Sequence, residues 1–183
     1  MLARKPIFPN VLEMNVQAGQ LIGCNVYLIH DGDEWALIDI GYQDSVEEII
    51  ELIRQMDFPL SKCKTLIATH ADVDHGQGFA AAKQILKTSL TAHPKAARLL
   101  AEGDRLQTFA EVEAQGISME MPKVTCEHLV QDGDVIKIGS LELEVSVFEF
   151  LLEYYLVFVF ELAFVFGSQL MLLLYSELAF VSE

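Results

Sequence analysis

The stretch 65-TLIATHADVDHGQGFAAAKQ-84 is the most informative part of this chain. A short apolar run leads into His70, and Asp72, Asp74 and His75 follow within the next five positions. The glycines after them lead into an alanine-rich segment whose apolar residues recur at helical spacing. The stretch therefore predicts a buried strand, a polar loop and a helix, with two imidazoles and two carboxylates crowded into the loop.

A divalent cation would explain this crowding. Imidazole nitrogen and carboxylate oxygen both bind zinc at about 2.0–2.2 Å, and the ion would remove the repulsion between Asp72 and Asp74. In an extended segment, residues two apart point to the same side, so we expect His70, Asp72 and Asp74 to project together and His75 to follow at the turn into the helix. Such mixed donors suit zinc, iron or manganese. The alternative is that His70 merely ends a strand and the aspartates are solvated residues near a helix N-terminus.

Strands and helices alternate on both sides of this stretch, which predicts an α/β fold. Ser45 and Glu48 have the spacing of a capping box at the start of one helix. Asp104 is placed to cap another helix that runs toward Gly116. The expected strands are 21–30, 35–41, 65–70, 90–93, 124–130, 134–138 and 141–145, and the expected helices are 45–56, 78–87, 94–103 and 104–116.

Composition limits the classes of function. With 183 residues, 52% of them hydrophobic, we expect a single domain over 1–183. The net charge of −15 argues against nucleic acid as a partner. Cys24, Cys63 and Cys126 are widely spaced, which predicts free thiols in a reducing compartment. The first residues are not followed by the apolar region of a signal peptide, so we expect a cytoplasmic protein.

The segment 148–183 is an atypical apolar tail. It contains no Lys, Arg, Asp, His or Pro, and ELAFV occurs in it twice, at 161–165 and 177–181. Its glutamates divide it into pieces shorter than the ~20 apolar residues that a membrane helix needs, so we do not expect it to cross a membrane. Its strong β-propensity predicts either buried strands or an abnormal segment that is prone to aggregate.

The motif 70-HADVDH-75 resembles the HxHxDH signature of metallo-β-lactamase-fold hydrolases, which include glyoxalase II and related thioesterases and lactonases. The upstream segment NVYLIHDGDEWALIDIGY (25–42) is similar to the early hairpin of that family. HPKAARLL (93–100) and LVQDGDVIKIGSLELEV (129–145) are similar to its later elements. The resemblance covers roughly residues 11–147.

This resemblance implies an αββα sandwich and a metal-dependent hydrolase. A metal-bound hydroxide would attack the carbonyl of a small ester, thioester or amide. Residue by residue, His70 and Asp72 would serve a first metal site and Asp74 with His75 a second, and Asp74 would also orient the attacking water. The cofactor implied is a divalent metal, foremost zinc, with iron or manganese as alternatives.

The chain departs from the family pattern in two ways. Asp72 stands where the family usually has histidine, and this harder ligand would favour iron or manganese. The family also supplies a Pro-Gly-His, a bridging aspartate and a late histidine after a strand like 141–145, but here no histidine follows His128 and no aspartate follows Asp134. The alternative reading is therefore a catalytically impaired or truncated relative that lacks the second half of the metal site. A redox diiron relative would need a flavin domain, for which this chain has no room.

The remaining candidates have supporting or structural roles. The resemblance places Asp39 near the metal loop, where its carboxylate could accept a hydrogen bond from a ligand histidine. His30, His93 and His128 are expected to be structural or solvent-exposed. The sequence indicates neither the substrate nor the oligomeric state.

Overall fold

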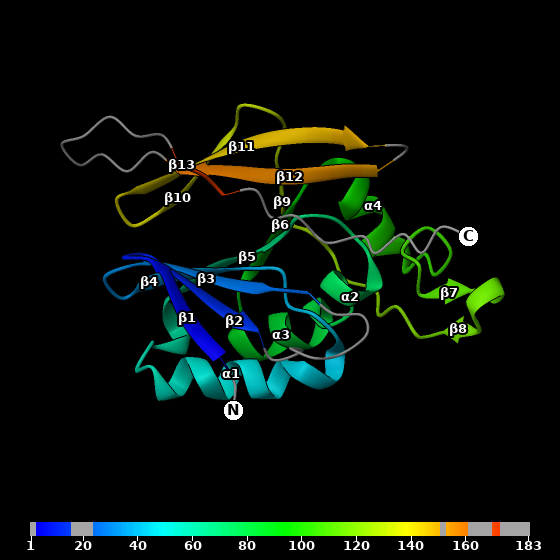
Figure 1. The fold of residues 1–183 in the computed structure, drawn as a ribbon, viewed down its shortest axis with the longest axis horizontal. Helices are drawn as coiled ribbons and strands as arrows, with labels where there is room; N and C mark the ends of the chain where they lie inside the picture. Colours follow the sequence, from blue (N-terminus) through cyan, green and yellow to red (C-terminus); the bar gives the residue numbers. More distant parts are fainter. Residues whose placement is uncertain (1–2, 16–23, 151–152, 161–169, 173–183) are drawn as a thin grey trace.

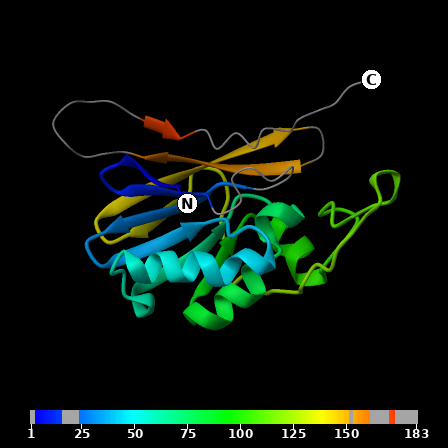
Figure 2. The ribbon, with the colours of Figure 1, turned by 60° about the horizontal axis from the view of Figure 1, so that its bottom comes forward.

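Two large β-sheets packed face to face, with helices on the far side of the larger one, make up most of the described part of the protein, and β7 (Glu111–Val112) and β8 (Ile117–Ser118) form a separate two-stranded sheet (Figure 1). The computed structural model describes residues 3–15, 24–150, 153–160 and 170–172. In Figure 2 the layers follow one another from the helices through the seven-stranded sheet to the four-stranded sheet. This is the mixed α/β architecture that the sequence predicts.

The seven-stranded sheet changes from antiparallel to parallel at the point that forms the site. Its strand order is β1-β2-β3-β4-β5-β6-β9; β1 to β4 pair antiparallel, whereas β4, β5, β6 and β9 pair parallel. The carboxyl ends of β4, β5 and β6 therefore share one edge of the sheet. The bounds are β1 (Ala3–Phe8), β2 (Val11–Asn15), β3 (Val26–Asp31), β4 (Glu34–Ile38), β5 (Cys63–Ala68), β6 (Ser89–Ala92) and β9 (His128–Leu129).

Within the described residues four α-helices accompany the parallel strands, and the longer ones match the sequence prediction. Val46, Ile49, Ile50 and Ile53 recur on one face of α1 and are all buried there. α4 begins at a proline and ends at Gly103, whose φ of +63° is in the left-handed region that favours glycine. The bounds are α1 (Val46–Gln55), α2 (Val73–Gly76), α3 (Phe79–Leu86) and α4 (Pro94–Glu102).

Strand β4 shows how one sheet serves two cores. Trp35 and Leu37 belong to the cluster between the sheet and the helices, and Ala36 and Ile38 belong to the cluster between the two sheets. All four side chains are fully buried. A strand that is covered on both faces has apolar residues at every position, which is why polar and apolar residues do not alternate in 35–38.

A contact between two turns ties the sheets together at one end. The Oδ2 atom of Asp31 accepts hydrogen bonds from the backbone N and the Oγ of Ser140, both at 2.6 Å. The carboxylate of Glu34 accepts a hydrogen bond from the backbone N of Gly139 at 3.2 Å. The hydrogen bonds from Ser140 lower the pKa of Asp31 below its ordinary value, because they favour the charged carboxylate.

Three sequence expectations were wrong in detail. Ser45 makes no side-chain cap to α1, because it belongs to the 3-10 turn η1 (Gln43–Ser45) that precedes the helix. No helix runs from 104 to 116: Phe109 adopts a positive φ of 54°, and the segment forms turns and the short strands β7 (Glu111–Val112) and β8 (Ile117–Ser118). Within the expected strand 124–130, only β9 pairs with the sheet.

The smaller sheet contains β10 (Val135–Ile138), β11 (Leu141–Phe150), β12 (Glu153–Phe160) and β13 (Leu170–Leu172). Residues 148–150, 153–160 and 170–172 of the apolar tail thus contribute strands, and the rest of the tail lies outside the described residues. The described helices all precede β10, so the described part of the chain forms three of the four layers of an αββα sandwich. None of its helices has the length and apolar character that crossing a membrane requires.

Candidate metal centre

The candidate site lies where β4 and β5 end side by side. Asp39 follows β4 directly and adopts a φ of 58°, a left-handed conformation that aspartate tolerates better than most residues. Its backbone N donates to the carbonyl of Ile67 at 2.8 Å, so the turn is fixed to β5. The next backbone N–H groups, of Ile40 and Gly41, both donate to the carbonyl of His75 at 3.2 Å. The end of β4 and the loop 70–75 are therefore held together by the backbone.

Asp39 is the centre of a buried hydrogen-bond network. Its Oδ1 accepts the backbone N–H of Thr69 at 2.9 Å, and its Oδ2 accepts the Thr69 hydroxyl at 2.7 Å. The same Oδ2 lies 2.8 Å from Nδ1 of His75. The carboxylate is 2% exposed, so these partners replace water around it. The expectation that Asp39 bonds to a histidine of the loop is confirmed.

The two histidines of the loop face each other. The ring centroids of His70 and His75 are 4.1 Å apart, and both side chains are buried. Nδ1 of His70 lies 2.7 Å from the Thr69 hydroxyl, just as Nδ1 of His75 lies beside Asp39. Each ring is thus anchored through Nδ1 to the same Asp39–Thr69 pair. A ligand histidine is usually oriented in this way by a hydrogen bond at its other nitrogen.

The Nε2 atoms point toward the two aspartates of the loop. Nε2 of His70 is 3.5 Å from Oδ2 of Asp72, and Nε2 of His75 is 3.8 Å from Oδ2 of Asp74. All four residues singled out from the sequence are therefore brought together in pairs. Their nitrogen and oxygen donors are of the kinds that bind zinc, iron and manganese, so the residues present fit a divalent metal.

Asp39, His70 and His75 also form a compact group whose possible ligand atoms all lie within 4.8 Å of one another. Both carboxylate oxygens of Asp39 already accept hydrogen bonds from Thr69 or face His75. The carboxylate of Asp39 is therefore positioned to orient the two imidazoles. Thr69 is the residue that sequence reasoning missed, because its partner Asp39 lies 30 positions earlier in the chain.

Burial and charge set the protonation of these groups. Burial, with a smaller effect of His75, lowers the pKa of His70 to about 3, so its imidazole is neutral and able to donate a lone pair. Burial alone would lower the pKa of His75, but the adjacent Asp39 carboxylate outweighs it and raises that pKa. Burial likewise opposes ionisation of Asp39, yet His75 holds the pKa of this carboxyl below its ordinary value. The contact between His75 and Asp39 therefore favours the charged form of each group.

The backbone of the loop differs from the expectation in one respect. We expected an extended segment in which His70, Asp72 and Asp74 project to one side. Instead the chain turns into α2 at Val73, so Asp74 and His75 lie within a helical turn that Asp72 precedes. The hydrogen bond from the backbone N of Val73 to the carbonyl of Thr108, at 2.8 Å, fixes this turn. The helical turn brings His75 back beside His70.

The other histidines and the cysteines behave as expected. The ring of His30 packs against Phe58 with centroids 5.0 Å apart, and Nδ1 of His93 accepts the backbone N–H of Lys95 at the start of α4. His128 is exposed on β9. All three cysteines are free thiols, and Cys24 is buried.

Residues 19–148 match the family described as the metallo-beta-lactamase superfamily. This match covers well over half of the chain, so the chain belongs to the metallo-beta-lactamase superfamily. The recognised loop, its strand and its helix all lie inside the matched range. No match was found among curated proteins.

Solved structures of this superfamily share the fold. MIM-2 metallo-beta-lactamase is 25% identical, with a TM-score of 0.65, over 75% of this chain and 50% of that one. A beta-lactamase from Chitinophaga pinensis is 26% identical, with a TM-score of 0.63 and the same coverage. A metallo-beta-lactamase from Cronobacter sakazakii, at 22% identity, has a TM-score of 0.71 over 87% of this chain and 60% of its own. The chain thus spans half to three-fifths of the length of these structures.

Proposed function

We propose that this protein is a metal-dependent hydrolase that cleaves an ester, thioester or amide bond in a small molecule. The observation that carries the proposal is the arrangement of His70 and His75, whose Nδ1 atoms are anchored while their Nε2 atoms face Asp72 and Asp74. Membership of a superfamily of metallo-hydrolases supports the same reaction class.

In this proposal His70, Asp72, Asp74 and His75 would hold the metal, while Asp39 and Thr69 orient the two imidazoles. A divalent cation held there would lower the pKa of a coordinated water and polarise the scissile carbonyl. Asp74 is the proposed catalytic residue: its carboxylate would accept a hydrogen bond from the attacking water and orient it. Zinc is the first choice of metal, and the carboxylate of Asp72 makes iron and manganese the alternatives.

A chromogenic ester and a thioester, each assayed with and without a chelator, test this function. We expect turnover that the chelator removes and that added zinc, iron or manganese restores. Asp74→Asn should lower kcat by about 10²–10⁴-fold, the usual contribution of a positioned acid–base group. Glu144→Gln is the matched control, because Glu144 is exposed on β11 and the substitution removes one negative charge, as Asp74→Asn does. Equal activity of the two variants would argue against the role of Asp74.

The alternative proposal is a catalytically impaired or truncated relative. It is favoured by the absence of any histidine after His128 and any aspartate after Asp134, where the family pattern places further ligands. This alternative predicts that the protein binds a metal through the loop but turns over neither substrate. Sequencing the 3′ end of the coding region in all frames provides a second test, because a shifted frame with a Pro-Gly-His and a later aspartate would identify the tail as an error.

We further propose a single domain over 1–183, with 148–183 as its atypical tail, in the cytoplasm. The free thiols of Cys24, Cys63 and Cys126 support a reducing compartment. The acidic charge supports a small-molecule substrate and no nucleic-acid partner. Fractionation of cells that express the full chain tests the location, and a secreted or membrane-bound protein would contradict it.

A further inference from the structure

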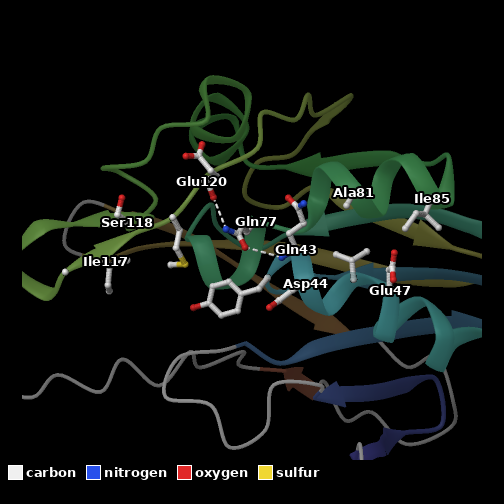
Figure 3. Close-up of a pocket in the computed structure, with 13 residues that line it drawn as sticks. Gln43, Asp44, Glu47, Gln77, Ala81, Ile85, Ile117, Ser118 and Glu120 are labelled. Atoms are coloured by element: carbon white, nitrogen blue, oxygen red, sulfur yellow. Dashed lines mark hydrogen bonds between the residues drawn. The ribbon is translucent and has the colours of Figure 1, made fainter.

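A groove with a volume of about 1110 Å³ lies on the helix side of the molecule (Figure 3). One wall is the start of α1 and the preceding turn, the second is α3, and the third is the segment 116–120 at and after β8. Gln77 joins two of these walls: its amide oxygen accepts the backbone N–H of Gln43 at 3.1 Å, and its Nε2 donates to the carbonyl of Glu120 at 2.8 Å. None of the four proposed metal-holding residues lines this groove.

The groove combines apolar walls with acidic residues. Ile85 and Ala81 from α3 and Ile117 and Met119 from the opposite wall supply the apolar surface, and Ile85 is 39% exposed. Three carboxylates also line it, those of Asp44, Glu47 and Glu120, and all three residues are exposed. The groove has no lysine or arginine among its lining residues. It therefore suits a ligand that is both apolar and positively charged.

The three carboxylates are not neutralised by the described part of the chain. None of the ion pairs between described residues involves Asp44, Glu47 or Glu120. Asp44 and Glu47 lie at the N-terminus of α1, where the helix dipole favours acidic side chains, whereas Glu120 follows β8 on the third wall. All three carboxylates would attract a positively charged ligand in the groove.

The third wall is held firmly in place. Nε of Arg105 donates to the carbonyl of Met119 at 2.8 Å, and its NH2 donates to Oγ of Ser118 at 2.8 Å. Together with the bond from Gln77 to Glu120, these contacts fix residues 118–120 of the segment that lines the groove. A surface that is already ordered loses little conformational entropy when a ligand binds.

We propose that this groove binds an extended peptide segment in which lysine or arginine alternates with apolar residues. The side chains of such a segment point alternately to opposite sides, so one set would contact Ile85 and Ile117 while the other reaches the carboxylates. The volume slightly exceeds the 300–1,000 Å³ typical of small-molecule sites, which favours a peptide over a small amine. The proposal does not depend on the hydrolase function.

Fluorescence anisotropy with a labelled seven-residue peptide of alternating lysine and leucine tests the proposal on the full chain. The triple variant Asp44→Asn, Glu47→Gln, Glu120→Gln should weaken binding on the order of tenfold. A control triple variant, Asp33→Asn, Asp57→Asn, Glu144→Gln, removes the same charge at exposed positions outside the groove and should change Kd by less than about twofold. Ile85→Gln should also weaken binding, because it removes apolar contact from an exposed position.

Three results would overturn the proposal. Equal weakening in both triple variants would show general attraction of a cation to an acidic protein. Displacement of the peptide by spermine at matched charge concentration would show a small-cation site. Equal binding of a glutamate–leucine peptide would remove the role of charge. Circular dichroism of each variant confirms that it is folded, and because all the substituted residues are exposed, loss of fold is not the expected outcome.

Discussion

Replacing Asp39 by asparagine should separate metal affinity from fold stability. The asparagine is nearly the same size, and its carbonyl oxygen can still accept the backbone N–H of Thr69, which lies 2.9 Å from the aspartate in the native protein. The hydroxyl of Thr69 can rotate to accept a hydrogen bond from the new amide group. The backbone N–H and the hydroxyl of Thr69 therefore each keep a hydrogen-bond partner.

The effect falls on His75. An aspartate carboxylate only accepts hydrogen bonds, so it keeps a proton on Nδ1 of His75, 2.8 Å away, and leaves the lone pair on Nε2. The asparagine amide would donate to Nδ1 and shift the proton of the neutral ring to Nε2, so a metal could bind Nε2 only by displacing that proton and breaking the new hydrogen bond. Changes of this kind beside a metal ligand usually cost 10–100-fold in affinity, or about 1.4–2.7 kcal/mol.

Competition with a chromophoric chelator measures this loss, and urea denaturation measures stability in parallel. Asp132→Asn is the matched control, because Asp132 is an exposed aspartate that accepts a backbone hydrogen bond from Val147 away from the loop. Asp39→Ala should lose affinity and stability together, since it leaves Thr69 donors buried without an acceptor, at about 1–3 kcal/mol for each. If folded Asp39→Asn bound zinc within about twofold of the native protein, the orienting role of Asp39 would be refuted.

Further predictions concern the fold. Phe79→Ala should lower the free energy of unfolding by about 3–5 kcal/mol, measured by urea denaturation, because the ring is fully buried; a loss below about 1 kcal/mol would contradict this packing. Gly103→Ala should destabilise by more than about 1 kcal/mol in the same assay, since the residue has a φ of +63° and its new Cβ would lie 2.7 Å from the carbonyl of Met121; an unchanged midpoint would contradict it. Asp31→Asn should lower the free energy of unfolding by its full amount above about pH 5, because the bonds from Ser140 stabilise the ionised carboxyl. The difference between native protein and variant should shrink as the pH falls through about 4 toward the lowered pKa of the folded state, and a difference independent of pH would contradict this.

The sequence predicted the parts of the fold that local patterns encode. The periodicity of α1 and the proline and glycine at the ends of α4 each mark an element without reference to its neighbours. The segment after Asp104 misled prediction, because the carboxylate does bond to the following N–H groups but in a turn that Phe109 interrupts. A local capping signal cannot distinguish a helix from a single turn.

The site shows the same limit. The four residues of the loop were visible as a motif. The contact between His70 and His75, however, depends on a helical turn, whereas we predicted an extended loop. Thr69 was invisible as a partner because its role depends on Asp39, a residue 30 positions earlier that only the parallel pairing of β4 and β5 brings beside it. Predicting contacts between distant segments requires knowledge of how the strands pair, and no local sequence pattern contains that information.

Metal content tests the central claim most directly. The protein, incubated with zinc and passed through a desalting column, should retain about one equivalent, and the double variant His70→Ala, His75→Ala should retain less than about 0.1. His93→Ala, which removes a histidine at the start of α4, should retain as much as the native protein. Less than about 0.1 equivalent in the folded native chain, or equal retention in all of these proteins, would contradict a metal centre at this loop.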